Sequence, residues 1–153
     1  EKMEALRWIH YLKQDGTIIV NDQSIDPMPV ITGLAQYPDD IWQRLNKWSS
    51  NVISIDALSI AKELGNIRVA NTVLLGVLAQ KLGVPAESWE KIIENTVPSK
   101  TIAINTQAFY RGYNRFKFSN SSRLRAKVEM FQKLNYGGSF QKFSYVILLL
   151  IKC

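Results

Sequence analysis

Residues 66–79 of this chain read Asn66-Ile-Arg-Val-Ala-Asn71-Thr-Val-Leu-Leu-Gly76-Val-Leu-Ala79. Apolar residues fall on every side of this segment at helical spacing, which predicts a buried helix over residues 67–82. Gly inside a helix costs about 1 kcal/mol relative to Ala, so we expect another backbone or helix to pass close to Gly76. Core packing and a ligand contact are both open interpretations of Gly76.

Asn71 stands out in the same helix because its neighbours are almost all apolar. We expect its amide to be buried, and a buried amide needs partners for its oxygen and its nitrogen that helix neighbours cannot all supply. Two interpretations follow: Asn71 tethers a neighbouring loop, or it contacts a substrate.

Before this helix, strands and helices alternate. β-branched runs at residues 17–20 and 52–55 predict buried strands, and helical spacing covers residues 3–12, 39–48 and 56–64. We expect Asp39 and Asp40 in the first turn of the second helix, where the helix dipole favours acidic side chains. The alternation predicts a parallel sheet built from right-handed crossovers, with helices on its faces. After it we expect only helices, at residues 67–82, 85–96 and 101–113, so the predicted class is α/β with a C-terminal helical layer.

Composition limits the classes of function. The chain has 153 residues, 46% of them apolar, which suffices for one domain core and a tail. Residues 1–109 hold ten Lys or Arg and twelve Asp or Glu, whereas residues 110–153 hold nine and one, so the basic excess belongs to the tail alone. The single cysteine, Cys153, excludes a Cys-x-x-Cys ligand set and favours a reducing cytoplasm. The longest apolar run has seven residues, too few for a membrane span.

Several side chains could belong to a site, and each also has a structural interpretation. Asp22 and Asp56 follow the two strands, where open α/β sheets place ligand groups, but turns and helix caps also use Asp there. His10 is the only histidine, and no motif places a nucleophile near it, so we expect a structural role. An aromatic set could form a partner-facing patch or belong to the core: Tyr37 with Pro38, Trp42 and Trp48.

A series of motifs in uninterrupted order resembles the gamma domain of 2-oxoacid:ferredoxin oxidoreductases, and most closely the beta subunit of the indolepyruvate enzymes. The resemblance covers residues 1–113. It rests on Glu4-Ala5-Leu6-Arg7, Gly16-Thr-Ile-Ile-Val-Asn21, Ile25-x-Pro27-x-Pro29-Val30, Tyr37-Pro38, Ile55-Asp56-Ala57, Ala61-x-x-Leu64-Gly65-Asn66-x-Arg68-x-x-Asn71-x-x-x-Leu75-Gly76 and Asn105-x-x-Ala108-Phe109-x-x-Gly112.

The resemblance implies a three-layer Rossmann or flavodoxin-like parallel sheet in a multisubunit enzyme. That enzyme oxidatively decarboxylates a 2-oxoacid and passes electrons to ferredoxin. Thiamine diphosphate, magnesium, iron–sulfur clusters and coenzyme A would belong to the complex, held mainly by a larger subunit, so no catalytic, cofactor or metal residue is expected here. The candidate interface or structural residues are Tyr37, Pro38, Asn66, Arg68, Asn71, Gly76, Asn105, Phe109 and Gly112.

This chain departs from the family pattern at both ends. Family members begin with a strand and a Gly-x-Gly-Gly-Gln-Gly loop, whereas residue 1 here already lies in a predicted helix, so we expect an N-terminally truncated sheet. Residues 1–113 would be the gamma-type domain, and residues 114–153 a basic tail that does not align with the family. Phe116 and Phe118 among its basic residues give the alternative function, a nucleic-acid-binding module, although such a run is more often a solvated or partner-facing helix.

Overall fold

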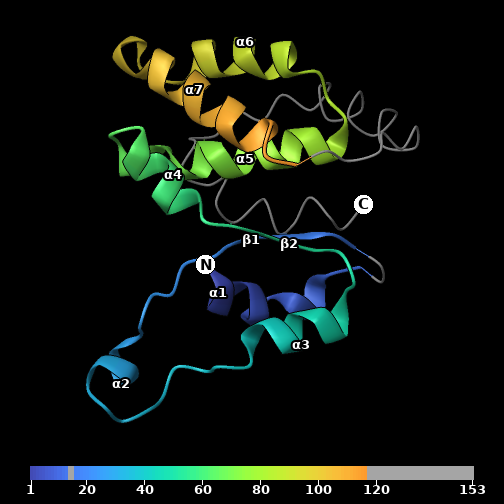
Figure 1. Ribbon diagram of the computed structural model, residues 1–153, viewed down its shortest axis with the longest axis vertical. Coiled ribbons are helices and arrows are strands. Elements are labelled where there is room, and N and C mark those ends of the chain that lie inside the picture. The colour runs from blue at the N-terminus through green and yellow to red at the C-terminus, as the bar shows by residue number, and fades with distance from the viewer. Residues whose placement is uncertain (14–15, 117–153) are drawn as a thin grey trace. The chain divides into compact units, whose positions relative to one another are not determined.

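The computed structural model describes residues 1–13 and 16–116, so the predicted tail lies outside the described residues from residue 117 on (Figure 1). The described chain falls into two compact units. The first is Glu1–Asp56, and the second begins at Ala57.

The first unit is a parallel pair of strands with helices before and between them. Its elements are α1 (Lys2–Arg7), a 3₁₀ helix (Ile9–Tyr11), β1 (Ile18–Asn21), α2 (Met28–Ile31), α3 (Ile41–Trp48) and β2 (Val52–Ile55). β1 pairs with β2 in parallel, so that Ile18 lies opposite Val52 and Asn21 lies opposite Ile55. The predicted strands and their parallel arrangement are therefore confirmed. Burial of both strands was also expected, and it holds for β1 but not for β2, where Ser54 is exposed and only Ile55 is buried.

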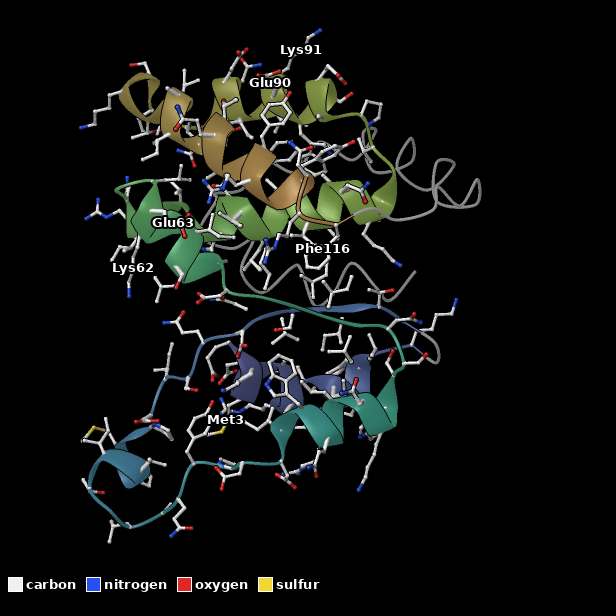
Figure 2. All side chains as sticks on the ribbon, in the orientation of Figure 1. Met3, Lys62, Glu63, Glu90, Lys91 and Phe116 are labelled. Carbon is white, nitrogen blue, oxygen red and sulfur yellow. The ribbon has the colours of Figure 1, made fainter. Side chains whose placement is uncertain are left out.

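Alternate residues of β1 point to the core of this unit, because strand side chains change face at every residue. Ile18 and Val20 are buried against α1 and α3, and Met3 packs on the same group (Figure 2). The buried members of this core are Ala5, Ile9, Ile18, Val20, Ile41 and Leu45.

The second unit is helical. Its elements are α4 (Ala57–Glu63), a 3₁₀ helix (Ile67–Val69), α5 (Ala70–Leu82), α6 (Ala86–Thr96), a 3₁₀ helix (Ser99–Thr101) and α7 (Ile102–Tyr113). Gly83 ends α5 in the left-handed conformation, with φ 67°, and Pro85 stands at the N-cap of α6. In Figure 1, α7 crosses between α5 and α6. The helical layer expected after the sheet is present, and the α/β class, consistent with a flavodoxin-like fold, is confirmed.

Two local expectations needed correction. α3 begins at Ile41, so Asp39 and Asp40 precede its first turn, and Asp40 occupies the N-cap without a side-chain capping bond. The short helix α2 was not predicted, because the Pro residues around it hide any helical spacing. In the described part of the chain, no helix has the length and apolar composition that a membrane span requires.

Candidate functional site

The α5–α7 contact brings together four of the candidate residues, and two glycines define it. A Cβ atom built on Gly76 would lie 2.6 Å from the backbone nitrogen of Tyr113 and would overlap the carbonyl oxygen of Phe109. A Cβ atom on Gly112 would lie 2.8 Å from the carbonyl carbon of Val73. Each glycine therefore accepts the backbone of the other helix. The close approach predicted at Gly76 is confirmed.

A partly buried hydrogen bond joins the same two helices. The hydroxyl of Thr72, which is buried, donates to Oδ1 of Asn105 at 2.8 Å, and Nδ2 of Asn105 donates to the carbonyl oxygen of Thr101 at 2.9 Å. Both ends of the Asn105 amide are thus engaged inside the unit. This geometry assigns Asn105 a positioning role between α5 and α7.

Phe109 is the aromatic centre of the second unit and is completely buried. Its ring centroid lies 5.6 Å from those of Tyr110 and Tyr113, and 6.4 Å from that of Trp89 on α6. The Tyr113 hydroxyl donates to the carbonyl oxygen of Val84 at 3.2 Å, which ties the end of α7 to the loop after α5. Phe109 therefore acts in packing.

Acidic side chains of two other helices form an ion pair and a hydrogen bond with residues on the outer surface of α7. Glu63 of α4 pairs with Arg111, and Glu90 of α6 accepts a 3.3 Å hydrogen bond from the Tyr110 hydroxyl (Figure 2). Desolvation raises the pKa of Tyr110, and the nearby Glu90 carboxylate adds to this effect.

The start of α5 is a polar corner. Oδ1 of Asn66 accepts from the backbone N–H of Arg68 at 3.0 Å, which caps the 3₁₀ helix, while the Arg68 side chain is exposed. Asn71 is also exposed, so the expectation of a buried amide was wrong. The apolar residues that suggested burial lie further along α5, whereas Asn71 occupies its first turn. Arg68 and Asn71 are therefore both exposed at this corner.

In the first unit, Tyr37 contacts the residues at the start of α1. The Tyr37 hydroxyl donates to Oε1 of Glu1 at 2.6 Å, and Nζ of Lys2 lies 5.8 Å from the Tyr37 ring centroid. Desolvation, together with the Glu1 carboxylate, raises the pKa of Tyr37 to about 12. Burial by itself would raise the pKa of Glu1, but hydrogen bonds from Tyr37 and from backbone N–H groups outweigh it, so that pKa is lowered. Pro38, the neighbouring candidate, is half-buried.

The predicted aromatic set divides between core and surface. Tyr37 and Trp42 pack against the core of the first unit, whereas Trp48, at the end of α3, is 57% exposed. His10 is exposed, with its ring centroid 4.2 Å from that of Tyr11, as a structural role would allow.

Asp22 and Asp56 reach the same edge of the sheet, because they directly follow paired parallel strands. The backbone N–H of Asp22 donates to the carbonyl oxygen of Ile55 at 2.9 Å, and its carboxylate lies 3.8 Å from Nζ of Lys2. Both Asp side chains are exposed. Asp22 thus extends the strand pairing and forms a surface ion pair.

These contacts were only partly predictable from the sequence. The bond from Thr72 to Asn105 was not predicted, because it depends on the register between two helices whose bonded residues lie 33 positions apart in the chain. The available signal was a polar residue beside the apolar stretch of α5 and another on α7.

The described residues were searched for clusters of side chains that could bind a metal ion. Among residues 1–13 and 16–116, no three His, Cys, Asp or Glu side chains gather in a way that could hold a metal ion. What the arrangement supplies is a tightly packed helix pair, a polar corner at α5 and a tyrosine–carboxylate pair at α1.

Comparisons with known proteins place this chain among oxidoreductase subunits. The family model for pyruvate ferredoxin/flavodoxin oxidoreductase matches residues 1–115. Indolepyruvate oxidoreductase subunit IorB of Thermococcus kodakarensis is 39% identical over 117 residues, which make up 73% of this chain and 58% of that protein. Its namesake from Pyrococcus horikoshii is 38% identical with the same coverage. The common subunit gamma of the pyruvate/ketoisovalerate oxidoreductases of Pyrococcus furiosus is 27% identical over 105 residues, 68% of this chain and 50% of that protein.

The chain therefore spans little more than half the length of the curated relatives it matches. No solved structure matches it. The matched range includes every motif on which the resemblance rested, from Glu4 to Gly112, so the resemblance is confirmed. By the extent of this match, three quarters of its length, the chain belongs to the pyruvate ferredoxin/flavodoxin oxidoreductase family.

Proposed function

We propose that this chain is the gamma-type part of a 2-oxoacid:ferredoxin oxidoreductase that acts on indolepyruvate. In this proposal, residues 1–113 form the gamma-type domain and contribute structure and subunit contacts, and the reacting groups belong to a larger subunit. The observation that carries the proposal is the 38–39% identity to two proteins named indolepyruvate oxidoreductase subunit IorB.

The packing of the candidate residues supports a structural role. Gly76, Asn105, Phe109 and Gly112 are all used in joining α5 to α7. Arg68 and Asn71 remain exposed, and with Tyr37, Pro38 and Asn66 they are the candidates for subunit contact.

The donor groups of this chain do not fit the cofactors that the family implies. Iron–sulfur clusters are held by cysteine thiolates, and the one cysteine here, Cys153, lies outside the described residues. Magnesium prefers several oxygen ligands, and the described part of the chain gathers no such acidic group. The proposal therefore assigns thiamine diphosphate, magnesium and the clusters to the larger subunit, and it places the complex in the cytoplasm on the strength of the cysteine usage.

Copurification tests this proposal directly. The intact native subunit, tagged and recovered from its host, should bring with it a larger chain that contains thiamine diphosphate and iron. The complex should reduce ferredoxin when indolepyruvate is supplied, and the subunit alone should show no turnover. Recovery of the subunit without such a partner would refute the proposal.

Nucleic-acid binding through residues 114–153 is the second candidate, favoured by nine Lys or Arg against one acidic residue after position 109. Binding of this kind releases counterions and weakens steeply as salt rises. A gel-shift titration at two salt concentrations distinguishes the two candidates, since assembly with a larger protein subunit predicts no retarded nucleic acid at physiological salt.

A further inference from the structure

One loop of the first unit leaves several large apolar side chains exposed to solvent. Residues 24–36, called the arm here, carry α2 and stand away from the strands and helices of their own unit (Figure 1). Four large apolar side chains of the arm are mostly exposed: Ile25 (60%), Met28 (67%), Ile31 (66%) and Leu34 (85%). All four belong to one ten-residue segment, 25–34, and exposed apolar residues that are grouped mark interaction sites more often than scattered ones do.

Local hydrogen bonds give the arm a defined shape. The backbone N–H groups of Leu34 and Ala35 both donate to the carbonyl oxygen of Pro29, at 2.8 and 3.0 Å. The Thr32 hydroxyl donates to the carbonyl oxygen of Met28 at 2.9 Å, and Gly33 closes the turn with φ 74°. A segment that is ordered before binding loses less conformational entropy when it binds. The arm therefore presents its apolar side chains in a fixed arrangement.

The charge around the arm indicates what kind of surface it fits. Between residues 16 and 43 the chain has four acidic residues and no Lys or Arg. Asp22 and Asp40 pair with Lys2 and Arg44, so the negative charge next to the arm comes from Asp26 and Asp39. A second copy of the arm would bring like charges together, which disfavours self-association through it. An anionic membrane surface would repel the arm for the same reason. An apolar groove edged by Lys or Arg side chains complements both features.

We propose that the arm docks into an apolar groove with a basic rim on the larger subunit of the enzyme. Ile31 and Leu34 enter the groove, and Asp26 and Asp39 face the basic rim. This inference rests on the proposed function, and it adds the surface through which that assembly forms.

A fluorescent probe next to the anchors can report docking. Ala35 is exposed, so Ala35→Cys in a Cys153→Ser background gives one labelling site that leaves all four apolar side chains in place. The emission maximum of the label should shift to shorter wavelength when the larger subunit is added to the full chain, because docking moves the label into apolar surroundings. Because charged rims act mainly on association, Asp26→Asn with Asp39→Asn should slow association and weaken its dependence on salt.

Substitutions at the anchors measure their share of the affinity. Ile31→Ser with Leu34→Ser should raise the dissociation constant about tenfold or more, as expected for central apolar anchors. The matched control is Ile92→Ser, the same chemical change at an exposed position of α6, which should leave the dissociation constant within about twofold. All of these positions are exposed, so thermal midpoints should remain unchanged.

The possible results separate the inference from the proposed function. If the wild-type chain does not bind the larger subunit, the proposed function fails and the docking inference with it. If the wild type binds and the double variant binds equally well, the arm is not the docking element, although the proposed function stands. The inference is also overturned if the emission of the probe is already shifted in the free chain. A shift that depends on protein concentration would mean that a second copy covers the arm. A shift that is independent of concentration would mean that another segment of the same chain covers it. A shift with anionic vesicles in place of the larger subunit would equally overturn it.

Discussion

Gly76 and Gly112 allow the backbones of α5 and α7 to touch, and this contact explains why a buried helix contains a residue that weakens helices. In isolation, Ala would favour either helix by about 1 kcal/mol. A methyl group at Gly76 would instead overlap the carbonyl oxygen of Phe109, which is backbone and cannot rotate away. Steric overlap should therefore exceed the helical gain.

Gly76→Ala should accordingly lower the free energy of unfolding of the second unit by about 1–3 kcal/mol, the usual cost of overpacking. The measurement is native-state hydrogen exchange of the α5 and α7 amides, which reports this unit by itself. Gln107→Ala, on the exposed side of α7, is the control and should change stability by less than about 0.5 kcal/mol. Unchanged protection in Gly76→Ala would mean that the helices can separate at little cost.

Tyr37 makes the first unit sensitive to alkaline pH. Its pKa is raised to about 12 in the folded protein, against 10.0 for an ordinary tyrosine. Between these values the unfolded chain has released the phenolic proton and the folded chain has kept it, so stability should fall as pH rises from about 10 to about 12. The loss should be absent in Tyr37→Phe.

Phenolate absorbance can follow this titration as a difference between the wild type and Tyr37→Phe. Glu1→Gln should lower the Tyr37 pKa only in part, because desolvation is the larger cause and remains in the variant. A Tyr37 that titrates near 10 in the folded protein would contradict both its desolvation and its partly buried hydrogen bond to Glu1.

At the scale of elements, α5 and α7 act as one packed pair. Close backbone contact, the bond from Thr72 to Asn105 and the ring of Phe109 all fall along their interface. A partly buried hydrogen bond between two helices stabilises the pair modestly. It also fixes their register, because a shift would separate the Thr72 hydroxyl from the Asn105 oxygen.

A double-mutant cycle should detect this coupling. Thr72→Val leaves Oδ1 of Asn105 without its donor and should destabilise the second unit by about 1–3 kcal/mol. Adding Asn105→Ala should cost less than in the wild type, giving a coupling energy of about 0.5–1.5 kcal/mol, measured by hydrogen exchange in α5 and α7. The cycle of Thr72→Val with Gln107→Ala should show none. Full additivity of Thr72→Val and Asn105→Ala would disprove the bond.

The sequence predicted the elements with strong periodic signals and missed contacts between distant positions. The strands at residues 17–20 and 52–55 were found because β-branched runs are a local feature, and Gly76 was read correctly because a glycine inside a helix requires an external reason. Asn71 was misread because helical spacing alone cannot tell a first turn that faces solvent from the buried turns that follow. The helix α2 was not predicted, because Pro27 and Pro29 made the segment look irregular, although proline is common at the start of a helix.

For the whole molecule, the distribution of charge bears on the proposed assembly. Residues 1–109 are slightly acidic and residues 110–153 are strongly basic. Because their net charges have opposite signs, the two parts should attract partners of different charge. The family match covers residues 1–115, and the curated relatives are considerably longer than the matched segment. A chain of this kind is expected to affect the amount of assembled enzyme more than the chemistry of each active site.

Steady-state kinetics of the assembled complex can test that expectation. Gly112→Ala disturbs the helix pair without touching any proposed subunit contact, so it should reduce the yield of complex recovered by size exclusion. Because the proposal assigns the reacting groups to the larger subunit, kcat per complex and KM for indolepyruvate should stay within about twofold of the wild type. Gln107→Ala should change neither yield nor kinetics. A raised KM in the complex with Gly112→Ala would show that this chain helps to form the substrate site, and the noncatalytic role would then be wrong.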